Sequence, residues 1–455
     1  MRLKTIVLSL LLLISHQAYS TRYTTPGDGT TYSFSLLSQI EGSGVTYDNG
    51  VYLITSTCII SEGDYFKIDE GVVVEFGNEA ELILQGESDL RATSPTLLTR
   101  HGESATCVGI LIQNSSQATE AFNLQFEYVG LRGGTTKGMN VEQCSFKYHN
   151  GTTSSALFLG GNGARFNIKN CYFEQCEKAA VGGAANYSCP VIIEGCTFVK
   201  NSQANGNVPQ VNLTAADSII VRHCMVTGDS TLNMVGGIAV ANWFGTGIHH
   251  VLINDCEIRD NRYGITTMGI LDVAITDNLI INNQFETNPN NGGSGISLYD
   301  PYLQQKAVIS GNQIEKNLWG ITVIGCGDVN LGKTEIPESA EDYNPGRNIF
   351  VDNGNNGMPC DLYNNSSNTI YAQGNIWSVA VQDAANIEEV VFHQADNPAL
   401  GEVIYLPAGT PSSINPITQV QPSHTVYNLY GIPQGTVLNT LSKGIYIING
   451  KKIMK

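Results

Sequence analysis

Charged and titratable side chains gather between Arg222 and Arg262, and they are the first residues in the sequence that could do chemistry. They are Arg222, His223, Asp255, Glu257, Arg259, Asp260 and Arg262. A polysaccharide lyase needs a general base, a cation that neutralises the uronate carboxylate and, normally, carboxylates that bind Ca²⁺ on one outer face. The same residues could instead form exposed ion pairs, each worth roughly a few tenths of a kcal/mol. We favour surface ion pairs, so no catalytic residue is assigned.

Aromatic residues form a second group of candidates. Trp243 lies in the sequence Asn-Trp-Phe, and Tyr299, Asp300 and Tyr302 lie in Tyr-Asp-Pro-Tyr. Exposed aromatic rings spaced along a groove suit stacking on sugar rings. Alternatively, the rings pack their loops against the body of the protein, and we favour this interpretation. If the protein does bind a ligand here, the candidate binding residues are Trp243, Tyr299, Asp300, Tyr302, Arg259 and Arg262.

The elements that would position these residues repeat along the sequence. In the stretch 251–265, two short runs with alternating apolar residues are separated by a corner, and an asparagine and a glycine mark the next bend. The corner position recurs at intervals of 22 to 36 residues, at Cys144, Cys171, Cys196, Cys224, Cys256, Asn278, Asn312, Asn348 and Asn375. Five residues after the corner stand Asn201, Asn261, Asn283, Asn317 and Asn353. Asparagine tolerates a left-handed bend and can hydrogen-bond to the like amide one coil above.

Such a unit cannot bury its own apolar face, so successive copies must stack to form a core. The repeat resembles the right-handed parallel β-helix family, and the resemblance covers residues 45–380. A leucine-rich repeat is disfavoured because strand-forming residues dominate and the interval varies. A two-sheet sandwich would not hold one column as five cysteines followed by four asparagines. We predict an all-β solenoid in which the residues of one column lie directly above one another.

The N-terminal residues 1–20 have the pattern of a secretory signal peptide. Arg2 and Lys4 precede an apolar run at 6–14, and Ala-Tyr-Ser ends the segment at Ser20. The apolar run is about half the length that spans a bilayer, so we expect no transmembrane segment. Residues 21–44 form an N-terminal segment ahead of the first predicted coil. We expect an exported protein.

The composition disfavours two classes of partner. The formal net charge is -17, whereas nucleic acid and anionic membranes are bound by clustered lysine and arginine. We therefore expect neither nucleic acid nor a membrane as a partner. The composition also bears on the fold, because the 48 glycines and the 14% of charged residues fit many tight corners and long buried strands.

The sequence contains 11 cysteines. Five of them occupy the corner column, where neighbours would lie about 4.8 Å apart with parallel side chains, a poor fit to the disulfide torsion. We expect stacked, reduced thiols in this column. Two pairings elsewhere are considered, Cys176 with Cys189 and Cys326 with Cys360. No cysteine or histidine cluster has metal spacing, so we expect no zinc site and no cofactor, and leave Ca²⁺ open.

Residues 381–408 are predicted to cover the last coil. The stretch 383–393 predicts a short amphipathic helix, with Asp383 as its N-cap and Ile387, Val390 and Val391 on one face. The stretch 396–407 resembles the closing segment of bacterial β-helices. Residues 409–423 are rich in proline, serine, threonine and glutamine and predict a linker.

The final segment, residues 424–455, predicts a β-hairpin. Asn449 and Gly450 lie between the apolar runs 445–448 and 451–453, and this dipeptide favours a two-residue hairpin turn. The ending resembles the C-terminal sorting tail of type IX secretion. The resemblance implies the type IX machinery as a partner, and release or display outside the outer membrane of a Gram-negative bacterium.

Parallel β-helices include polysaccharide lyases, glycosidases, adhesins and noncatalytic proteins, so the fold does not choose a function. The Gly-His-Gly, Asp-Asp and Asn-Thr-Asp motifs of polygalacturonases are absent from the sequence. We expect an exported cell-surface or secreted protein that contacts glycan or host material without catalysis. The alternatives are a polysaccharide lyase or glycosidase that acts on acidic polysaccharide, and a structural spacer or adhesin stalk.

Overall fold

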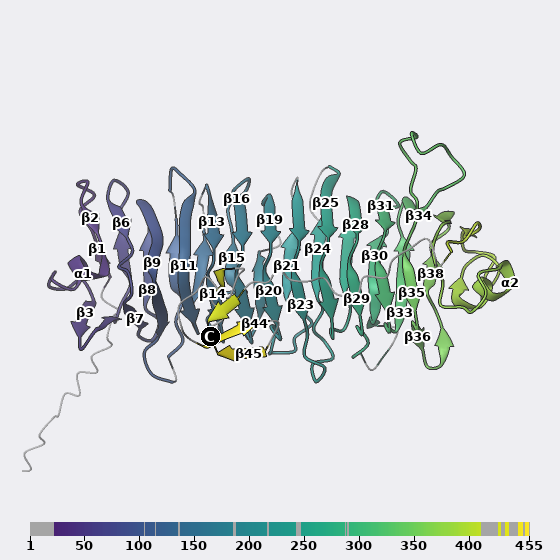
Figure 1. Cartoon of the computed structure of the whole chain (residues 1–455). Helices are drawn as coiled ribbons and strands as arrows, with labels where there is room; N and C mark the ends of the chain where they lie inside the picture. Colours follow the sequence, from purple (N-terminus) through teal and green to yellow (C-terminus); the bar gives the residue numbers. More distant parts are fainter. Residues whose placement is uncertain are drawn as a thin grey trace, which may run out of the picture.

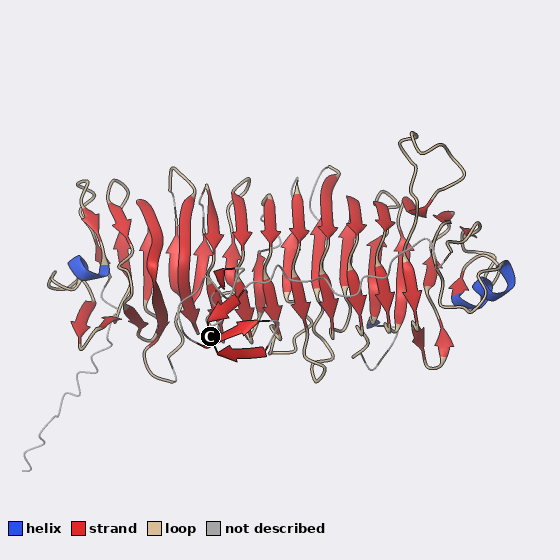
Figure 2. Ribbon diagram, in the orientation of Figure 1, coloured by secondary structure: helices blue, strands red, loops and turns tan. Residues whose placement is uncertain are grey.

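The computed structural model of the chain is almost entirely β-structure, wound into stacked coils that form one elongated body (Figures 1 and 2). It describes residues 22–410, apart from 104, 114, 135–136, 185–187, 216–217, 243–246, 287 and 289–290, together with four short strands within residues 426–454. The predicted signal peptide at 1–20 and nearly all of the predicted linker at 409–423 lie outside the described residues.

Each regular coil contributes one strand to each of three parallel sheets. Sheet A has 14 strands: β1 (Tyr23–Thr24), β5 (Cys58–Ile60), β8 (Glu81–Leu84), β10 (Gly109–Ile112), β12 (Gly130–Gly133), β15 (Ser155–Leu159), β18 (Ala179–Gly183), β21 (Val211–Thr214), β24 (Ile238–Asn242), β27 (Ile265–Gly269), β30 (Ser294–Asp300), β33 (Trp319–Gly325), β38 (Leu362–Asn365) and β40 (Val391–Phe392). The other two sheets, B and C, follow it in each coil and share two long strands, β9 (Glu87–Arg100) and β11 (Thr119–Glu127), which continue through the corner.

Sheets B and C contain the shorter strands of the coils. Sheet B has β2 (Thr31–Tyr32), β6 (Tyr65–Lys67), β13 (Gly138–Glu142), β16 (Arg165–Lys169), β19 (Val191–Glu194), β22 (Ile219–Arg222), β25 (His249–Asn254), β28 (Leu271–Thr276), β31 (Lys306–Ser310), β34 (Asp328–Gly332), β39 (Ile370–Ala372) and β41 (Val403–Ile404). Sheet C has β3 (Val45–Asp48), β4 (Val51–Ile54), β7 (Val73–Phe76), β14 (Ser145–Lys147), β17 (Tyr172–Glu174), β20 (Thr197–Val199), β23 (Met225–Thr227), β26 (Glu257–Arg259), β29 (Leu279–Ile281), β32 (Gln313–Glu315) and β35 (Ile349–Val351). The first of these, β3, is the exception to the parallel arrangement, because it pairs antiparallel with β4.

Inward side chains stack in columns through the core. In sheet B, Val221 pairs with Ile253 and Ile253 pairs with Ile275, and all three are buried. In sheet C, the rings of Phe126, Phe146, Phe173 and Phe198 lie nearly parallel, with successive centroids 4.6, 4.9 and 4.9 Å apart. The predicted stacking of like residues, and with it the β-helix, is confirmed.

Asparagine side chains continue the cysteine column as a ladder of amides. The backbone N–H of Cys256 donates to Asn278 Oδ1 over 2.9 Å. Below it, the Nδ2 of each asparagine donates to the Oδ1 of the next, over 2.9 Å at each of the three steps from Asn278 to Asn312, Asn348 and Asn375. These amides are buried, so water cannot replace the hydrogen bonds of any rung.

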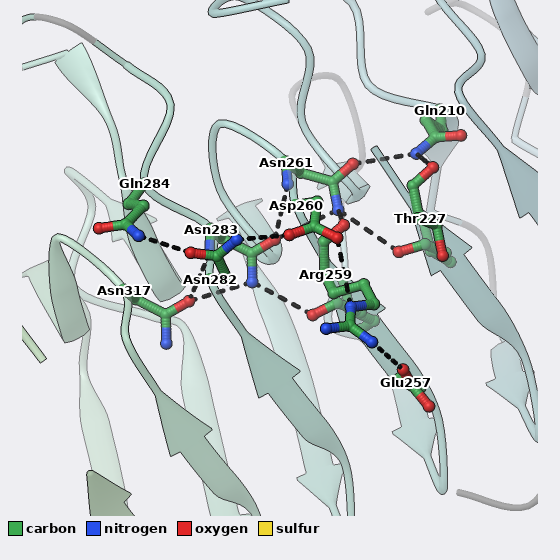
Figure 3. Close-up of polar contacts among 12 residues, drawn as sticks. Gln210, Thr227, Glu257, Arg259, Asp260, Asn261, Asn282, Asn283, Gln284 and Asn317 are labelled. Atoms are coloured by element: carbon green, nitrogen blue, oxygen red, sulfur yellow. Dashed lines mark hydrogen bonds and ion pairs between the residues drawn. The ribbon is translucent and has the colours of Figure 1, made fainter. Parts of the chain in front are cut away.

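A second ladder follows the corner after sheet C. It runs through Asn261, Asn283, Asn317 and Asn353, with Nδ2 to Oδ1 distances of 3.2, 3.0 and 3.1 Å. Figure 3 shows its first three members. The coil before Asn261 has no asparagine at this position, and Gln210 occupies the rung instead. Its Oε1 accepts from Asn201 Nδ2 over 3.0 Å, and its Nε2 donates to Asn261 Oδ1 over 2.9 Å.

All 11 cysteines are free and buried, as expected for the corner column. The two pairings considered elsewhere are wrong, because all four of these thiols are free. Cys176 Sγ is 3.8 Å from the Phe146 carbonyl, whereas Cys189 Sγ is 3.1 Å from that of Gly161. Burial raises the pKa of the Cys326 and Cys360 thiols to about 12, which keeps them protonated at neutral pH.

The two ends of the solenoid are covered. At the N-terminal end, Phe34 and Leu37 of α1 (Phe34–Leu37) are buried against the first coil. The coils begin at β1 and β2, which pair with β5 and β6, and thus earlier than the predicted residue 45. At the other end, Asp383 accepts from the Asn386 N–H over 3.0 Å and caps α2 (Ala384–Ile387).

The C-terminal helix is shorter than the predicted 383–393. It continues as the 3₁₀ turn η2 (Glu388–Val390) and then stops, because Val391 and Phe392 pair with Leu362 and Tyr363 and extend sheet A. Sheet B closes in the same way, since β41 pairs with β39. No helix in the described ranges is long and apolar enough to cross a membrane.

Two antiparallel units lie outside the three sheets. The short hairpin of β36 (Gly354–Asn355) and β37 (Met358–Pro359) projects between β35 and β38 in the sequence. The tail forms a four-stranded sheet from β42 (Val426–Asn428), β43 (Pro433–Gly435), β44 (Ile445–Ile448) and β45 (Lys451–Met454). The antiparallel pairing of β44 with β45 confirms the predicted hairpin, whose turn at 449–450 lies outside the described residues.

Candidate functional site

The outer face of sheet A carries a polar column along its C-terminal half. Ile265, Ile296 and Ile321 point into the core, so the next residue of each strand points outward. In register, these outward residues are Asn212, Ala239, Thr266, Ser297, Thr322, Tyr363 and Phe392. The seven strands from β21 to β40 give six spacings of about 4.8 Å, so the column is about 29 Å long.

Three connected hollows lie along this column, and we call them together the outer groove. The first and second have volumes of about 310 Å³ each and share Asn291, Gly292, Ser294 and Ser297 in their linings. The second and third share Trp319 and Tyr363, and the third, of about 490 Å³, reaches Phe392 and the hairpin at Met358. The outer groove is thus a row of adjoining hollows on the outer face of sheet A from β21 to β40.

The floor of the outer groove changes from hydroxyl to aromatic along its length. Ser294 and Thr322 contact each other through their hydroxyl oxygens at 2.9 Å, next to Thr266 and Ser297. Further along, the ring of Tyr363 lies 5.7 Å from that of Trp319 and 5.0 Å from that of Phe392, centroid to centroid. Hydroxyl groups and aromatic faces are the two features that bind sugars.

Arg262, a predicted binding residue, lies in the wall of the first hollow. Its Nε is 3.2 Å from Glu286 Oε2, and the two side chains are 9% and 3% exposed. Its two terminal nitrogens donate to Asn207 Oδ1 and to the Asn291 carbonyl, which belong to two different loops. Arg262 therefore joins two loops that precede sheet A strands, along one side of the outer groove.

The aromatic candidates have different positions. Tyr299 pairs with Met268 and Ile324, which line the first and second hollows, so it lies in the outward column beside the floor. Tyr302 is 65% exposed in the turn after β30 and does not line the outer groove. Trp243 lies outside the described residues.

Asp300, the fourth residue of this predicted group, is fully buried. Its carboxylate accepts backbone N–H groups of Tyr302, Gln304 and Gln305 over 2.9, 2.6 and 2.6 Å. These bonds hold the turn that follows β30. The carboxylate of Asp300 therefore stabilises its own turn and does not face a ligand.

Arg259 and its charged neighbours lie on a different face from the outer groove. Arg259 belongs to β26 of sheet C, and its nitrogens lie 3.2 Å from Glu257 and 3.2 Å from Asp260 (Figure 3). Burial raises the pKa of Glu257, and the charge of Arg259 partly offsets this effect. The structure therefore separates Arg259 from Arg262, although they are three residues apart.

The remaining charged residues of this stretch form ion pairs between neighbouring coils. Glu194 lies 3.7 Å from Lys169 and 3.1 Å from Arg222, and His223 Nδ1 lies 2.8 Å from Asp255. These contacts agree with the surface ion pairs favoured from the sequence. In the described part of the chain, no cluster of three histidine, cysteine, aspartate or glutamate side chains could hold a metal ion.

Sequence reasoning missed Trp319 and Tyr363, which stand at the centre of the outer groove. The Gly-Ile pair that starts several sheet A strands could have pointed to Trp319, whereas Tyr363 follows Leu362 in a strand without this pair. Because the isoleucine points inward, the residue after it is the outward one, and Thr266, Ser297 and Thr322 all occupy this position. Trp319 directly precedes such a pair, Gly320 and Ile321.

The coils and their register define the chain as a right-handed parallel β-helix. Residues 108–269 match the family model described as a right handed beta helix region. Among solved structures, the chain is similar to the periplasmic alginate epimerase AlgG, with 10% identity over 83% of each chain and a TM-score of 0.37. It is also similar to the A-module of the Azotobacter vinelandii mannuronan C-5 epimerase AlgE6, with 8% identity over 79% of this chain and 89% of that one and a TM-score of 0.23. No curated protein matches the sequence.

Proposed function

We propose that the protein is a noncatalytic glycan-binding protein that holds an extended polysaccharide chain in the outer groove. The observation that carries this proposal is the continuous floor, which runs about 29 Å from Asn212 to Phe392 and changes from hydroxyl to aromatic side chains. A linear chain of sugars offers hydroxyl groups at its edges and apolar C–H faces along its length. Both features match the floor.

The rigidity of the floor supports the same proposal. Its side chains stand on strands whose neighbours pair in register on both sides, so their backbone positions are fixed before a ligand arrives. Arg262 holds two of the loops that line the first hollow. A site that is ordered in advance loses little conformational entropy on binding.

Replacing Trp319 with alanine is expected to weaken polysaccharide binding by about 10- to 100-fold, because an aromatic ring covered by ligand contributes roughly 1.5–3 kcal/mol. The measurement is isothermal titration of the wild-type and variant proteins with a polysaccharide identified on a glycan array. Tyr302→Ala is the matched control, since Tyr302 is an exposed aromatic residue outside the outer groove.

Three results would contradict this proposal. An array without any bound glycan would remove its basis and would favour the structural spacer. Release of unsaturated sugars from a polysaccharide by the wild-type protein would show that the protein is a lyase. An equal loss of affinity in Tyr302→Ala and Trp319→Ala would place the ligand elsewhere on the protein.

We also propose that the protein is exported and then released or displayed outside the outer membrane. The signal-peptide pattern at 1–20 and the ending at 424–455, which resembles a type IX sorting tail, support this proposal. Deletion of residues 424–455 is expected to retain the protein in the periplasm of a bacterium with type IX secretion. Fractionation with an antibody against the β-helix measures this, and unchanged surface display of the truncated chain would refute it.

A further inference from the structure

The charges that line the outer groove restrict the kind of polysaccharide that it can take. Arg262 is the one cationic side chain among the described residues that line the three hollows. Three acidic residues, Glu388, Glu389 and Asp396, line the third hollow. The lining therefore carries more negative than positive groups, in a protein whose formal net charge is -17.

The positive charge of Arg262 is already compensated within the wall. Its guanidinium lies 3.2 Å from the Glu286 carboxylate, and both side chains are almost completely buried. Its remaining donors are held by Asn207 and Asn291. An anionic ligand would have to displace these contacts, and removal of one partner from a buried ion pair is costly.

A polyuronate carries one carboxylate on each sugar, and each would lose water in the outer groove. A carboxylate that leaves water without gaining a cation pays a large desolvation cost. The negative field of the protein also slows the approach of a polyanion. Hydroxyl groups, in contrast, can bond to Thr266, Ser297 and Thr322 without any charge.

We propose that the polysaccharide bound in the outer groove is an uncharged one, such as a neutral glucan or mannan, and that polyuronates are excluded. This inference rests on the proposed function, because it assigns the ligand class of the same groove. Glu286 is then a specificity-determining residue, since its carboxylate cancels the charge that would otherwise attract an anionic chain.

The test compares the full chain with soluble neutral glucans and mannans and with polymannuronate and polygalacturonate, by affinity electrophoresis at low and high ionic strength. We expect at least one neutral polymer to bind roughly tenfold more tightly than either polyuronate, with little dependence on salt. Tighter binding of a polyuronate would overturn this inference and leave the proposed function intact. Binding of neither class would overturn the proposed function itself.

Glu286→Gln provides a second test, because it leaves the charge of Arg262 without a partner. We expect this variant to bind polyuronates several-fold more tightly than the wild type, whereas Glu335→Gln, which makes the same charge change at an exposed residue away from the groove, does not. Equal polyuronate affinity in the two folded variants would overturn the role of Glu286. Circular dichroism checks the folding of both variants, and the comparison of polymers on the wild type does not depend on them.

Discussion

Replacement of Asn312 with alanine is expected to lower the free energy of unfolding by about 4 kcal/mol, because several buried polar groups lose their partners at once. The Oδ1 of Asn312 accepts from Asn278 N and Nδ2 over 3.0 and 2.9 Å. Its Nδ2 donates to Asn348 Oδ1 over 2.9 Å and to the Ile275 carbonyl over 2.8 Å. Asn312 is fully buried, so water does not replace these bonds in the folded protein.

Equilibrium unfolding in guanidinium chloride measures this loss for the wild type and the variant. Asn212→Ala is the matched control, because Asn212 is an exposed asparagine on the outer face of a strand. We expect the control to change the free energy of unfolding by no more than about 0.5 kcal/mol. A loss below about 1 kcal/mol in Asn312→Ala would show that the amide ladder does not contribute as the geometry indicates.

Acidification from pH 6.5 towards pH 4 is expected to destabilise the protein through His149, which is fully buried. Burial lowers the pKa of His149 from 6.5 to about 4, and the charge of Lys178 acts in the same direction. The unfolded chain therefore takes up a proton at a higher pH than the folded one. The stabilising contribution is complete above pH 6.5 and is lost as the pH falls towards 4, a change of about 3 kcal/mol at the full shift.

The measurement is the difference between wild type and His149→Gln in the free energy of unfolding across this pH range. The difference between the two proteins is needed because Asp361 also titrates in this range. Burial raises the pKa of Asp361 to about 6, and its effect on stability has the opposite sign to that of His149. Protonated Asp361 favours the folded state, so that contribution is lost as the pH rises through 6. Parallel pH profiles of wild type and His149→Gln would show that His149 titrates as it does in the unfolded chain.

The sequence was sufficient to predict the fold because the same physical requirement recurs in every coil. Each corner needs a small or amide side chain and each inward position needs an apolar one, so Cys256 and Ile253 mark the register without knowledge of the loops. The helix at 383–393 was predicted too long because its apolar spacing also suits a strand. In the structure Val391 pairs with Leu362 and continues sheet A in place of another turn of helix.

The candidate site could be predicted only in part, because the outer groove depends on register between distant residues. Trp319 and Tyr363 are 44 residues apart, and the long coil between them hides their proximity. Asp300 was a candidate binding residue because it stands between two tyrosines, but in its turn three backbone N–H groups donate to its carboxylate. Sequence alternation indicates which side of a strand a residue faces, whereas it does not indicate what a loop covers.

Gln210 shows that when one coil has no asparagine in the second ladder, a residue from a neighbouring segment can supply the missing amide. The residue reaches in from the segment between β20 and β21 and bonds to Asn201 and Asn261 on either side. A turn can therefore lack the asparagine without breaking the interior, provided that an insertion supplies an equivalent amide. Proteins of this architecture can consequently gain, lose or lengthen individual turns while surface insertions repair the gaps, so rod length and loop repertoire can vary independently.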